Sequence, residues 1–262
     1  MSATAPALLE WERAEIARSG LQARLFNQVE PTSPTVLARY ASPAADTPYA
    51  WEYAFHLLGD ARGQRVLDLG CGAGECTTLV ASHGGRVTAL DISTDLLAMT
   101  RIRTTMDHVD DTVAPLCGSV HAIPLATASV DVVFGMAVLH HVDLALAAAE
   151  VHRVLKPGGR AIFTEPIRNS RTLAAVRGLI PYRQPDVSPF ERPLRFNEIE
   201  TFAAAFGSWS HRVFDLPFVQ LLRVCRARPS WQARAYACNM RLLQRWPQLR
   251  HFASVMVFQV RK

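Results

Sequence analysis

Residues 66–77 read Val-Leu-Asp-Leu-Gly-Cys-Gly-Ala-Gly-Glu-Cys-Thr, an apolar strand that runs directly into a glycine-rich turn. The turn needs glycine because its backbone takes positive φ and comes close to a ligand, where a Cβ would collide. Gly70, Gly72 and Gly74 supply these positions. The stretch therefore predicts the first strand and first loop of a doubly wound parallel α/β sheet, with a nucleotide-like ligand bound at the loop.

A second short strand, residues 87–91, ends in the carboxylate of Asp91. The first two strands of a doubly wound sheet lie side by side, so the glycine turn and the tip of the second strand face one crevice. A carboxylate at this position can accept hydrogen bonds from both hydroxyls of a ribose. The order of strand, glycines and acid is more specific than a lone Gly-x-Gly, which is often an ordinary tight turn.

The spacing of the glycines separates two cofactor classes. Dinucleotide enzymes favour Gly-x-Gly-x-x-Gly, whose third glycine lets the helix pack close to the strand. This chain has Glu75 at that position. A carboxylate there would repel a pyrophosphate but is tolerable beside a cationic ligand. A nicotinamide-dependent oxidoreductase therefore stays open as an alternative and is disfavoured by Glu75.

With Asp68 included, the pattern Asp-x-Gly-x-Gly-x-Gly resembles the first motif of class I S-adenosylmethionine-dependent methyltransferases. The resemblance implies S-adenosylmethionine as the cofactor and places the turn near its methionine part. It implies that Asp91 binds the ribose and that Ile92 flanks the adenine. The cofactor contacts expected from these two motifs are Asp68, Gly70, Cys71, Gly72, Gly74, Asp91 and Ile92.

The resemblance continues through residues 117–164. In the loop after the third strand the family usually places an acid that receives the adenine amino group, whereas this chain has Ser119 followed by Val120. Residues 129–134 match the fourth strand, after which Met136 and Ala137 would line the cofactor. Asp143 begins a helix that ends at residue 155, residues 156–159 turn, and residues 160–164 form the fifth strand. Residues 254–261 resemble the seventh strand of the fold.

The N-terminal segment, residues 1–48, is expected to be a helical lid or connector. Residues 7–18 and 21–29 have helical periodicity, interrupted by Gly20, and prolines mark an irregular connector after them. The helices either close the cofactor site or simply pack on the edge of the sheet. Tyr49 would contact the carboxylate of the cofactor, and residues 49–166 would form the cofactor-binding core.

Residues 167–262 are expected to combine substrate-covering insertions with the last strands. Residues 165–196 are rich in proline, contain a helical piece at 172–179 and begin where a ligand crevice lies in such sheets. A second insertion spans residues 223–251. Their aromatic residues, among them Tyr182 and Tyr236, would wall a pocket for a flat acceptor, although packing explains them equally well.

The chain has 262 residues and a formal net charge of +5. Residues 1–151 are acidic overall, whereas residues 152–262 are strongly basic and almost all of their bases are arginines. A solvated surface explains this best, and an anionic ligand or an anionic membrane is the alternative. No apolar run is long enough to span a membrane, and no signal peptide is evident, so we expect a cytoplasmic protein. The five cysteines lack metal-site spacing and are expected to be buried thiols of a reducing compartment.

Transfer of a methyl group from a sulfonium is an in-line displacement that needs a well-placed acceptor and, for a protonated acceptor atom, a base. His140 at the end of the fourth strand and Glu165 at the tip of the fifth are the candidate bases. The residues expected to contact the acceptor are His141, Arg168, Arg171 and Tyr182. No metal site is expected, and the oligomeric state is left open.

The sequence favours a small-molecule acceptor over a macromolecule. Methyltransferases that act on amino groups of nucleic-acid bases resemble one another in an Asn/Asp-Pro-Pro-Tyr/Phe tetrapeptide, where this chain has residues 135–138, Gly-Met-Ala-Val. The paired glutamates of protein-arginine methyltransferases are also missing. We expect transfer to an oxygen, nitrogen or sulfur atom of a lipophilic or aromatic metabolite. The alternatives are carbon methylation of a quinone- or lipid-like ring at the membrane surface, with Arg171, Arg177 and Arg183 as an anchor, and a cofactor-binding module without turnover.

Overall fold

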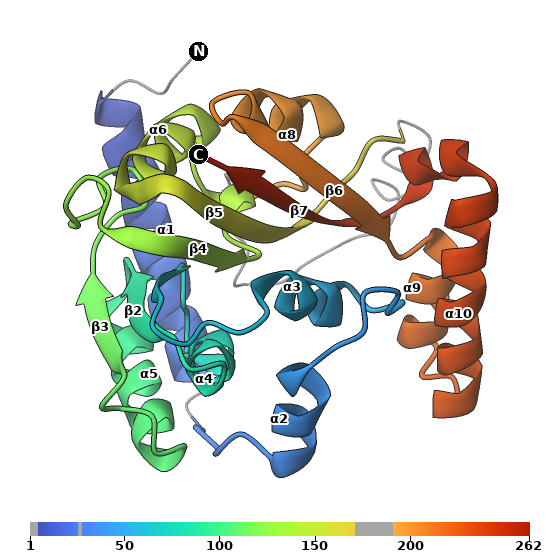
Figure 1. The fold of residues 1–262 in the computed structure, drawn as a ribbon, viewed down its shortest axis with the longest axis horizontal. Helices are drawn as coiled ribbons and strands as arrows, with labels where there is room; N and C mark the ends of the chain where they lie inside the picture. Colours follow the sequence, from blue (N-terminus) through green and yellow to red (C-terminus); the bar gives the residue numbers. More distant parts are fainter. Residues whose placement is uncertain (1–4, 26–27, 171–190) are drawn as a thin grey trace.

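A computed structural model describes residues 5–25, 28–170 and 191–262 of the chain. It contains a seven-stranded sheet with the order β3-β2-β1-β4-β5-β7-β6 (Figure 1). The strands are β1 (Arg65–Leu69), β2 (Arg86–Asp91), β3 (Val113–Cys117), β4 (Val130–Met136), β5 (Leu155–Pro166), β6 (Ser208–Phe214) and β7 (Val255–Arg261). The pairs among β1 to β5 are parallel, and β7 runs antiparallel to both β5 and β6.

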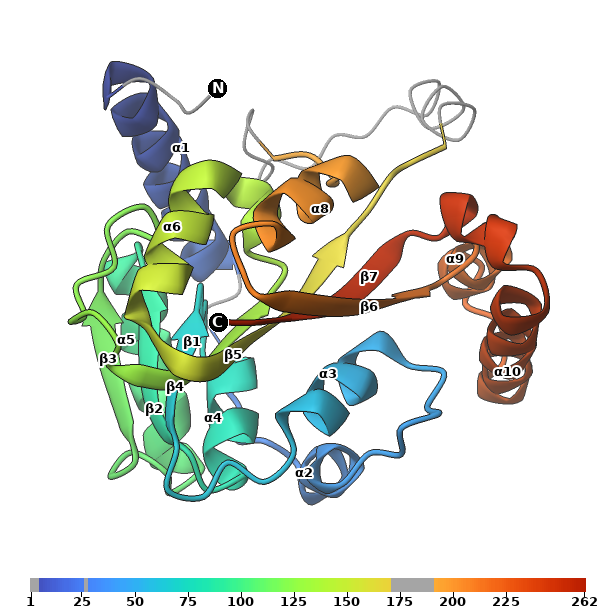
Figure 2. The ribbon, with the colours of Figure 1, turned by 45° about the horizontal axis from the view of Figure 1, so that its top comes forward.

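Helices cover both faces of the sheet, as Figure 2 shows from a tilted view. Alternate residues of one strand point to opposite faces, so Val66 joins an apolar cluster with α3 (Ala50–Leu58) and α4 (Glu75–Ser82). Leu67 joins the opposite cluster with α6 (Leu144–Val154) and α8 (Phe196–Ala203). The predicted doubly wound α/β class with a mostly parallel seven-stranded sheet is confirmed.

The N-terminal helix corrects one expectation. α1 (Ala5–Leu25) is continuous, so Gly20 does not end it, and the predicted second piece stops at Leu25. Glycine costs a helix about 1 kcal/mol relative to alanine, but α1 packs on α5 (Thr94–Met106) at this point. A Cβ on Gly20 would lie 3.4 Å from Oδ2 of Asp95. Close packing between the two helices therefore outweighs the propensity.

The connector after α1 contains a helix, although its prolines predicted an irregular segment. α2 (Pro34–Ala41) begins at Ser33, whose hydroxyl accepts a hydrogen bond from the backbone N–H of Val36 at 3.3 Å. Proline is tolerated in a first helical turn because its missing N–H would have no partner there. The sequence Ser-Pro at residues 33 and 34 is the signal that indicates this helix.

The fifth strand is longer than predicted. β5 begins at Leu155, which pairs with Val130, and the register shifts before Arg160 pairs with Val132. The expected turn at residues 156–159 is thus an irregularity within the strand, where Gly158 has a φ of +77°. The other core expectations hold, including the cap of α6 by Asp143, whose Oδ1 accepts from the N–H groups of Ala145 and Leu146.

The insertion between β6 and β7 is a helical hairpin. It consists of α9 (Pro217–Val224), α10 (Pro229–Arg245) and the short helix η2 (Pro247–Phe252), and it stands at the β6–β7 end of the molecule in both views (Figures 1 and 2). The helical piece predicted at 172–179 lies outside the described residues. Among the described helices, none has the length and apolar character that crossing a bilayer would require.

Candidate functional site

A cavity of about 660 Å³ opens at the carboxyl ends of β1, β2 and β4, and α1 forms one of its walls. Ten of the residues predicted to bind the cofactor are among those that line it. Those that line it are Asp68, Gly70, Cys71, Gly72, Asp91, Ile92, Ser119, Val120, Met136 and Ala137, together with His141. The sheet therefore brings these residues from four separate loops into one space.

The three glycines of the turn have different physical roles. Gly70 has a φ of +69°, and a Cβ there would lie 2.5 Å from Cγ2 of Val138. Gly74 has a φ of +83° and precedes α4, and its Cβ would meet Thr100 at 3.0 Å. Gly72 has a φ of +55° with nothing within 4 Å of a Cβ, so it faces the open cavity. Gly74 does not line the cavity and packs against Thr100, so its contact with the cofactor stays a prediction.

The carboxylate of Asp91 joins the two loops of the crevice. Its Oδ2 accepts from the N–H of Gly72 and its Oδ1 from the N–H of Ser93, both at 2.9 Å. Burial raises the pKa of this carboxyl, and the two backbone hydrogen bonds oppose the shift. Each carboxylate oxygen has a further lone pair. Asp91 can therefore hold the turn and still accept hydrogen bonds from a ribose.

Asp68 lies beneath the turn and is only 1% exposed. Burial raises its pKa to about 7, the hydroxyl of Thr77 opposes this by donating to Oδ2 at 2.6 Å, and the negative charge of Asp91 adds to the shift. A carboxyl with such a pKa gains or loses its proton near neutral pH. A cation bound above it would favour the ionised form.

α1 supplies an acid that sequence reasoning did not find. The hydroxyl of Ser119 donates to Glu12, and Nδ1 of His121 lies 3.1 Å from Glu12 Oε1. The loop after β3 lacks the acid that the family usually has, and the carboxylate of Glu12 stands beside that loop instead. Glu12 and Ser119 are 107 residues apart in the chain, so no local motif could reveal the pair.

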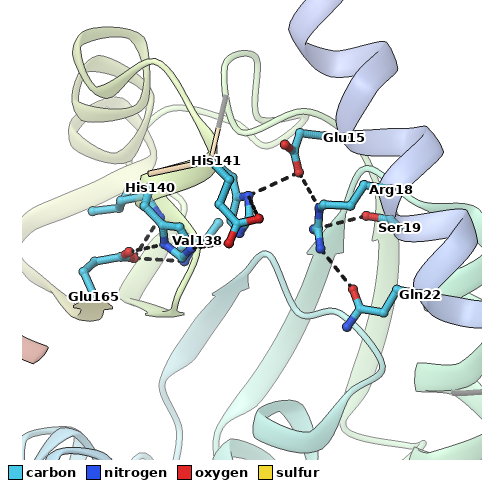
Figure 3. Close-up of polar contacts among 10 residues, drawn as sticks. Glu15, Arg18, Ser19, Gln22, Val138, His140, His141 and Glu165 are labelled. Carbon is cyan, nitrogen blue, oxygen red and sulfur yellow. Dashed lines mark hydrogen bonds and ion pairs between the residues drawn. The ribbon is translucent and has the colours of Figure 1, made fainter. Parts of the chain in front are cut away.

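Glu165 is fully buried and organises the turn after β4 (Figure 3). Its Oε1 accepts from the N–H groups of Val138 and Leu139 at 2.9 and 2.7 Å, and its Oε2 lies 2.8 Å from Nδ1 of His140. With its carboxylate oxygens engaged in this way, Glu165 positions His140. The carboxylate supports the imidazole from behind, and a role of Glu165 as the base itself stays a prediction.

His140 and His141 belong to the short helix η1 (Leu139–His141) but face different surroundings. His140 is 7% exposed and does not line the cavity, whereas His141 does. Nδ1 of His141 lies 3.3 Å from Oε2 of Glu15, and the same oxygen accepts from Nε of Arg18 at 2.9 Å (Figure 3). α1 is thereby linked to the end of β4 across the mouth of the cavity.

Three side chains near this turn could together hold a metal ion. The ligand atoms of His140, His141 and Glu191 all lie within 4.8 Å of one another. The expectation that the chain has no metal site rested on ligand spacing along the sequence, and that test cannot detect Glu191, which follows the fifth strand. Nε2 of His140 also lies 3.9 Å from Oε1 of Glu191.

Some of the predicted site residues do not line the cofactor cavity. The ring of Tyr49 packs 4.6 Å from the ring of Tyr236 and does not line the cofactor cavity, so its contact with the cofactor stays a prediction. Arg168 lines a different cavity of about 450 Å³ beside α8. Arg171 and Tyr182 lie outside the described residues, as do Arg177 and Arg183.

Glu75 also has a partner that the sequence did not reveal. Its Oε1 lies 3.6 Å from a guanidinium nitrogen of Arg103, and both residues line the cavity. Arg103 further donates to the carbonyl oxygen of Ala73 at 3.0 Å. The guanidinium offsets part of the repulsion that Glu75 would exert on a phosphate. Glu75 therefore disfavours a dinucleotide less than the sequence alone indicates.

Comparisons with known proteins bear on this cavity. Residues 67–163 match the family model described as a methyltransferase domain. The chain is 39% identical over 119 residues to the ubiquinone/menaquinone biosynthesis C-methyltransferase UbiE of Rubrivivax gelatinosus, a match that covers 44% of this chain and 45% of that protein. It is 34% identical over 173 residues to a malonyl-[acyl-carrier protein] O-methyltransferase of Enterobacter lignolyticus, covering 63% of each. The chain thus spans less than two thirds of the length of these relatives.

The fold has a solved counterpart over its whole length. The geranyl diphosphate C-methyltransferase of Streptomyces coelicolor A3(2), crystallised with S-adenosyl-L-homocysteine, superimposes with a TM-score of 0.63 at 16% identity and 100% coverage of both chains. At this identity the likeness concerns the fold alone. The matched domain, the relatives and the fold are all similar to those of class I S-adenosylmethionine-dependent methyltransferases.

Proposed function

We propose that this protein binds S-adenosylmethionine in the 660 Å³ cavity and transfers its methyl group to a small molecule. The observation that carries the proposal is the turn at Gly72, which presents open backbone to the cavity while Asp91 holds it from the neighbouring strand. A turn of this shape lets a ligand approach the backbone closely. Asp91 supplies the acceptor for the ribose hydroxyls.

The charge of the cavity supports a cationic cofactor. Asp68 and Asp91 lie at its floor, and Glu12 and Glu15 reach it from α1. Arg18 and Arg103 are the arginines among the described lining residues, so carboxylates are in excess. S-adenosylmethionine carries a sulfonium and an ammonium, and both interact favourably with such a surface. A dinucleotide would bring two negative phosphates to it.

The acceptor would meet the cofactor at the end of β4, where His140 and His141 lie. Because Glu165 holds Nδ1 of His140, we assign the N–H to that nitrogen, which leaves the lone pair on Nε2. Nε2 can take the proton of a hydroxyl, amine or thiol as its heteroatom attacks the methyl group. The acceptor atom stays a proposal, since the relatives include both a C-methyltransferase and an O-methyltransferase.

One experiment tests the proposal in two steps. Calorimetric titration should give saturable binding of S-adenosylmethionine and no comparable binding of NADH. The protein is then incubated with methyl-labelled cofactor and a metabolite extract, and a labelled product of small mass is expected. Tight binding of NADH, or a cofactor that binds without any transfer, would overturn the proposed function.

A second candidate, action on a lipophilic acceptor at a membrane surface, is favoured by the tip of the α9–α10 hairpin. Leu221, Val224 and Trp231 are 62%, 79% and 60% exposed there. Arg226 and Arg228 lie in the turn between the two helices, and residues 216–262 contain no aspartate or glutamate. Apolar side chains that alternate with arginines suit the interface of an anionic bilayer.

A further inference from the structure

A second cavity, of about 470 Å³, lies between the start of α3 and the α9–α10 hairpin. Trp51 lines both this cavity and the cofactor cavity, so the two spaces meet at this side chain. Val255, at the start of β7, forms part of its floor. Val255 pairs with Pro166 at the carboxyl end of β5. The second cavity therefore lies at the carboxyl ends of the parallel strands, where sheets of this kind bind ligands.

Aromatic rings dominate the wall of this cavity. Tyr40, Tyr49, Trp51 and Tyr236 line it. The rings of Tyr49 and Tyr236 are 4.6 Å apart at an angle of 51°, and the guanidinium carbon of Arg39 lies 4.8 Å from the centre of the Tyr49 ring. Such walls favour flat ring compounds through stacking and edge contacts. Arg39 and Arg223 also line the space, which disfavours a cationic ligand.

Asp215 provides a carboxylate in this aromatic space, and both its backbone conformation and its hydrogen bonding are unusual. It is 5% exposed and has a φ of +61°, a conformation that costs a non-glycine residue free energy. Its Oδ2 accepts from Nε2 of Gln220 at 3.2 Å and lies 3.9 Å from a guanidinium nitrogen of Arg223. Its Oδ1 is buried and has no hydrogen-bond partner within the part of the chain that the structure describes.

A buried acceptor without a donor destabilises the protein by roughly 1–3 kcal/mol. Strained residues and unsatisfied polar groups of this kind concentrate at ligand sites, where the ligand supplies the missing contact. Asp215 directly follows β6 and lines the second cavity. A donor brought in by a ligand would satisfy Oδ1 once the side chains that cover this oxygen move aside.

We propose that this second cavity is the binding site of the methyl acceptor, and that the acceptor is a flat ring compound whose hydroxyl group donates a hydrogen bond to Asp215. That the bound compound is the methyl acceptor rests on the proposed methyl transfer. That the cavity binds a flat ring compound does not depend on it. The ring packs against the pair formed by Tyr49 and Tyr236, on the side that faces the cavity, and the end to be methylated reaches the cofactor past Trp51. The hydroxyl held by Asp215 is an anchor and differs from the reacting group.

The test uses the full chain loaded with S-adenosylhomocysteine and a panel of flat phenols, each paired with its methyl ether. The named pair is 2-naphthol and 2-methoxynaphthalene, which differ in the ability to donate a hydrogen bond. Binding is followed by calorimetry. We expect the wild type to bind 2-naphthol at least tenfold more tightly than its ether, because only the phenol can pair with a buried carboxylate.

Three variants locate the binding. Asp215→Asn keeps the shape and tolerates positive φ, and Asp215→Gly removes the side chain while also fitting that backbone. Both should reduce the preference for 2-naphthol over its ether to less than threefold. Tyr236→Leu should weaken both compounds at least fivefold. Asp60→Asn, which alters an exposed aspartate paired with Arg62, is the control and should bind like the wild type.

The outcomes separate the two proposals. If S-adenosylhomocysteine binds but no phenol of the panel does, or if the phenols bind equally well to the Asp215 variants, the acceptor site is overturned and the proposed function stands. If S-adenosylhomocysteine itself fails to bind, the proposed function falls. A preference for 2-naphthylmethylammonium over 2-naphthol would overturn the assignment of a hydroxylated ring.

Discussion

Asp91 links two of the loops that line the cofactor cavity, and its removal should weaken the hydrogen bonding of both. Asp91→Ala deletes the acceptors for the N–H groups of Gly72 and Ser93 as well as the proposed ribose contact. A hydrogen bond to a charged group contributes about 1.5–3 kcal/mol. We therefore expect S-adenosylmethionine to bind tenfold to a hundredfold more weakly by calorimetry.

Asp95→Asn is the matched control, because Asp95 lies close to Asp91 in the chain, in the first turn of α5. Its affinity should stay within twofold of the wild type. An Asp91→Ala protein with unchanged affinity would remove this residue from the cofactor site.

Asp68 should make the stability of the ligand-free protein depend on pH. Its pKa is raised from 3.8 to about 7 in the folded state by burial. Between these two values the folded state holds a proton that the unfolded chain has released, so the free energy of unfolding falls as the pH rises through this window. Asp68→Asn cannot ionise. We expect the variant to be more stable than the wild type at pH 8 and to lose most of this advantage at pH 5.

Urea denaturation at the two pH values measures the difference. Each kcal/mol corresponds to about 2–4 °C in Tm for a chain of this size, so a thermal scan is an independent check. An equal gap between variant and wild type at both pH values would show that Asp68 does not titrate in this window.

His140 should affect turnover and leave cofactor affinity intact. Nε2 is the proposed proton acceptor, and proton transfer by a positioned side chain contributes typically 10²–10⁴-fold. His140→Gln should lower kcat about a hundredfold with the acceptor found in the labelling experiment. Binding of S-adenosylmethionine should be unchanged, since His140 does not line the cofactor cavity.

Glu165→Gln should show a smaller loss of kcat, because the carboxylate positions the imidazole and touches neither substrate nor cofactor. His152→Gln on α6 serves as the control. A wild-type rate in His140→Gln would assign the proton transfer to another group.

At the scale of elements, α1 should act as a movable wall of the cavity. Glu12 and Glu15 connect it to His121 and His141, at 3.1 and 3.3 Å. In the double variant Glu12→Gln/Glu15→Gln both contacts lose the carboxylate charge, at a cost on the order of 1 kcal/mol. We expect amide hydrogen exchange in α1 to be about fivefold faster and the cofactor to dissociate faster.

Glu10→Gln, on an exposed position of the same helix, controls for changes in the helix itself. Hydrogen exchange measured by mass spectrometry, with and without S-adenosylhomocysteine, separates the variants. Identical exchange in the double variant and in Glu10→Gln would mean that α1 is fixed by other contacts.

The elements that sequence analysis predicted well are those encoded locally. The strand from Val66 and its glycine turn, Asp91 at the tip of β2 and the cap at Asp143 follow from period, spacing and capping chemistry. The site partners Glu12, Glu15 and Glu191 could not be predicted, because they reach the site from segments distant in the chain. The same holds for Asp215, whose unsatisfied oxygen is a property of tertiary packing. Gly20 lies inside the continuous helix α1, because the contact of α1 with α5 overrides the low helix propensity of glycine.

At the scale of the whole molecule, the α9–α10 tip should bring the protein to anionic membranes. Vesicles that contain phosphatidylglycerol should carry the protein in a flotation assay, and vesicles of phosphatidylcholine alone should not. Salt screens exposed charges, so binding should fall several-fold between 0.05 and 0.5 M sodium chloride. Val224→Ser/Trp231→Ser should remove most of it.

Ile102→Ser is the matched control, because Ile102 is 52% exposed on α5, far along the chain from the hairpin. It should float like the wild type. Equal recovery with both kinds of vesicle, or none with either, would argue for a fully solvated hairpin and for acceptors taken from water.

The place of β7 in the sheet has a consequence for how the chain is made. β7 lies between β5 and β6, and β6 pairs with the rest of the sheet only through it. During synthesis the other six strands emerge first, so β5 must wait with an unpaired edge and β6 with no neighbour at all. Such edges invite pairing with other chains. The growing polypeptide is therefore most prone to aggregate in the interval before its seventh strand leaves the ribosome.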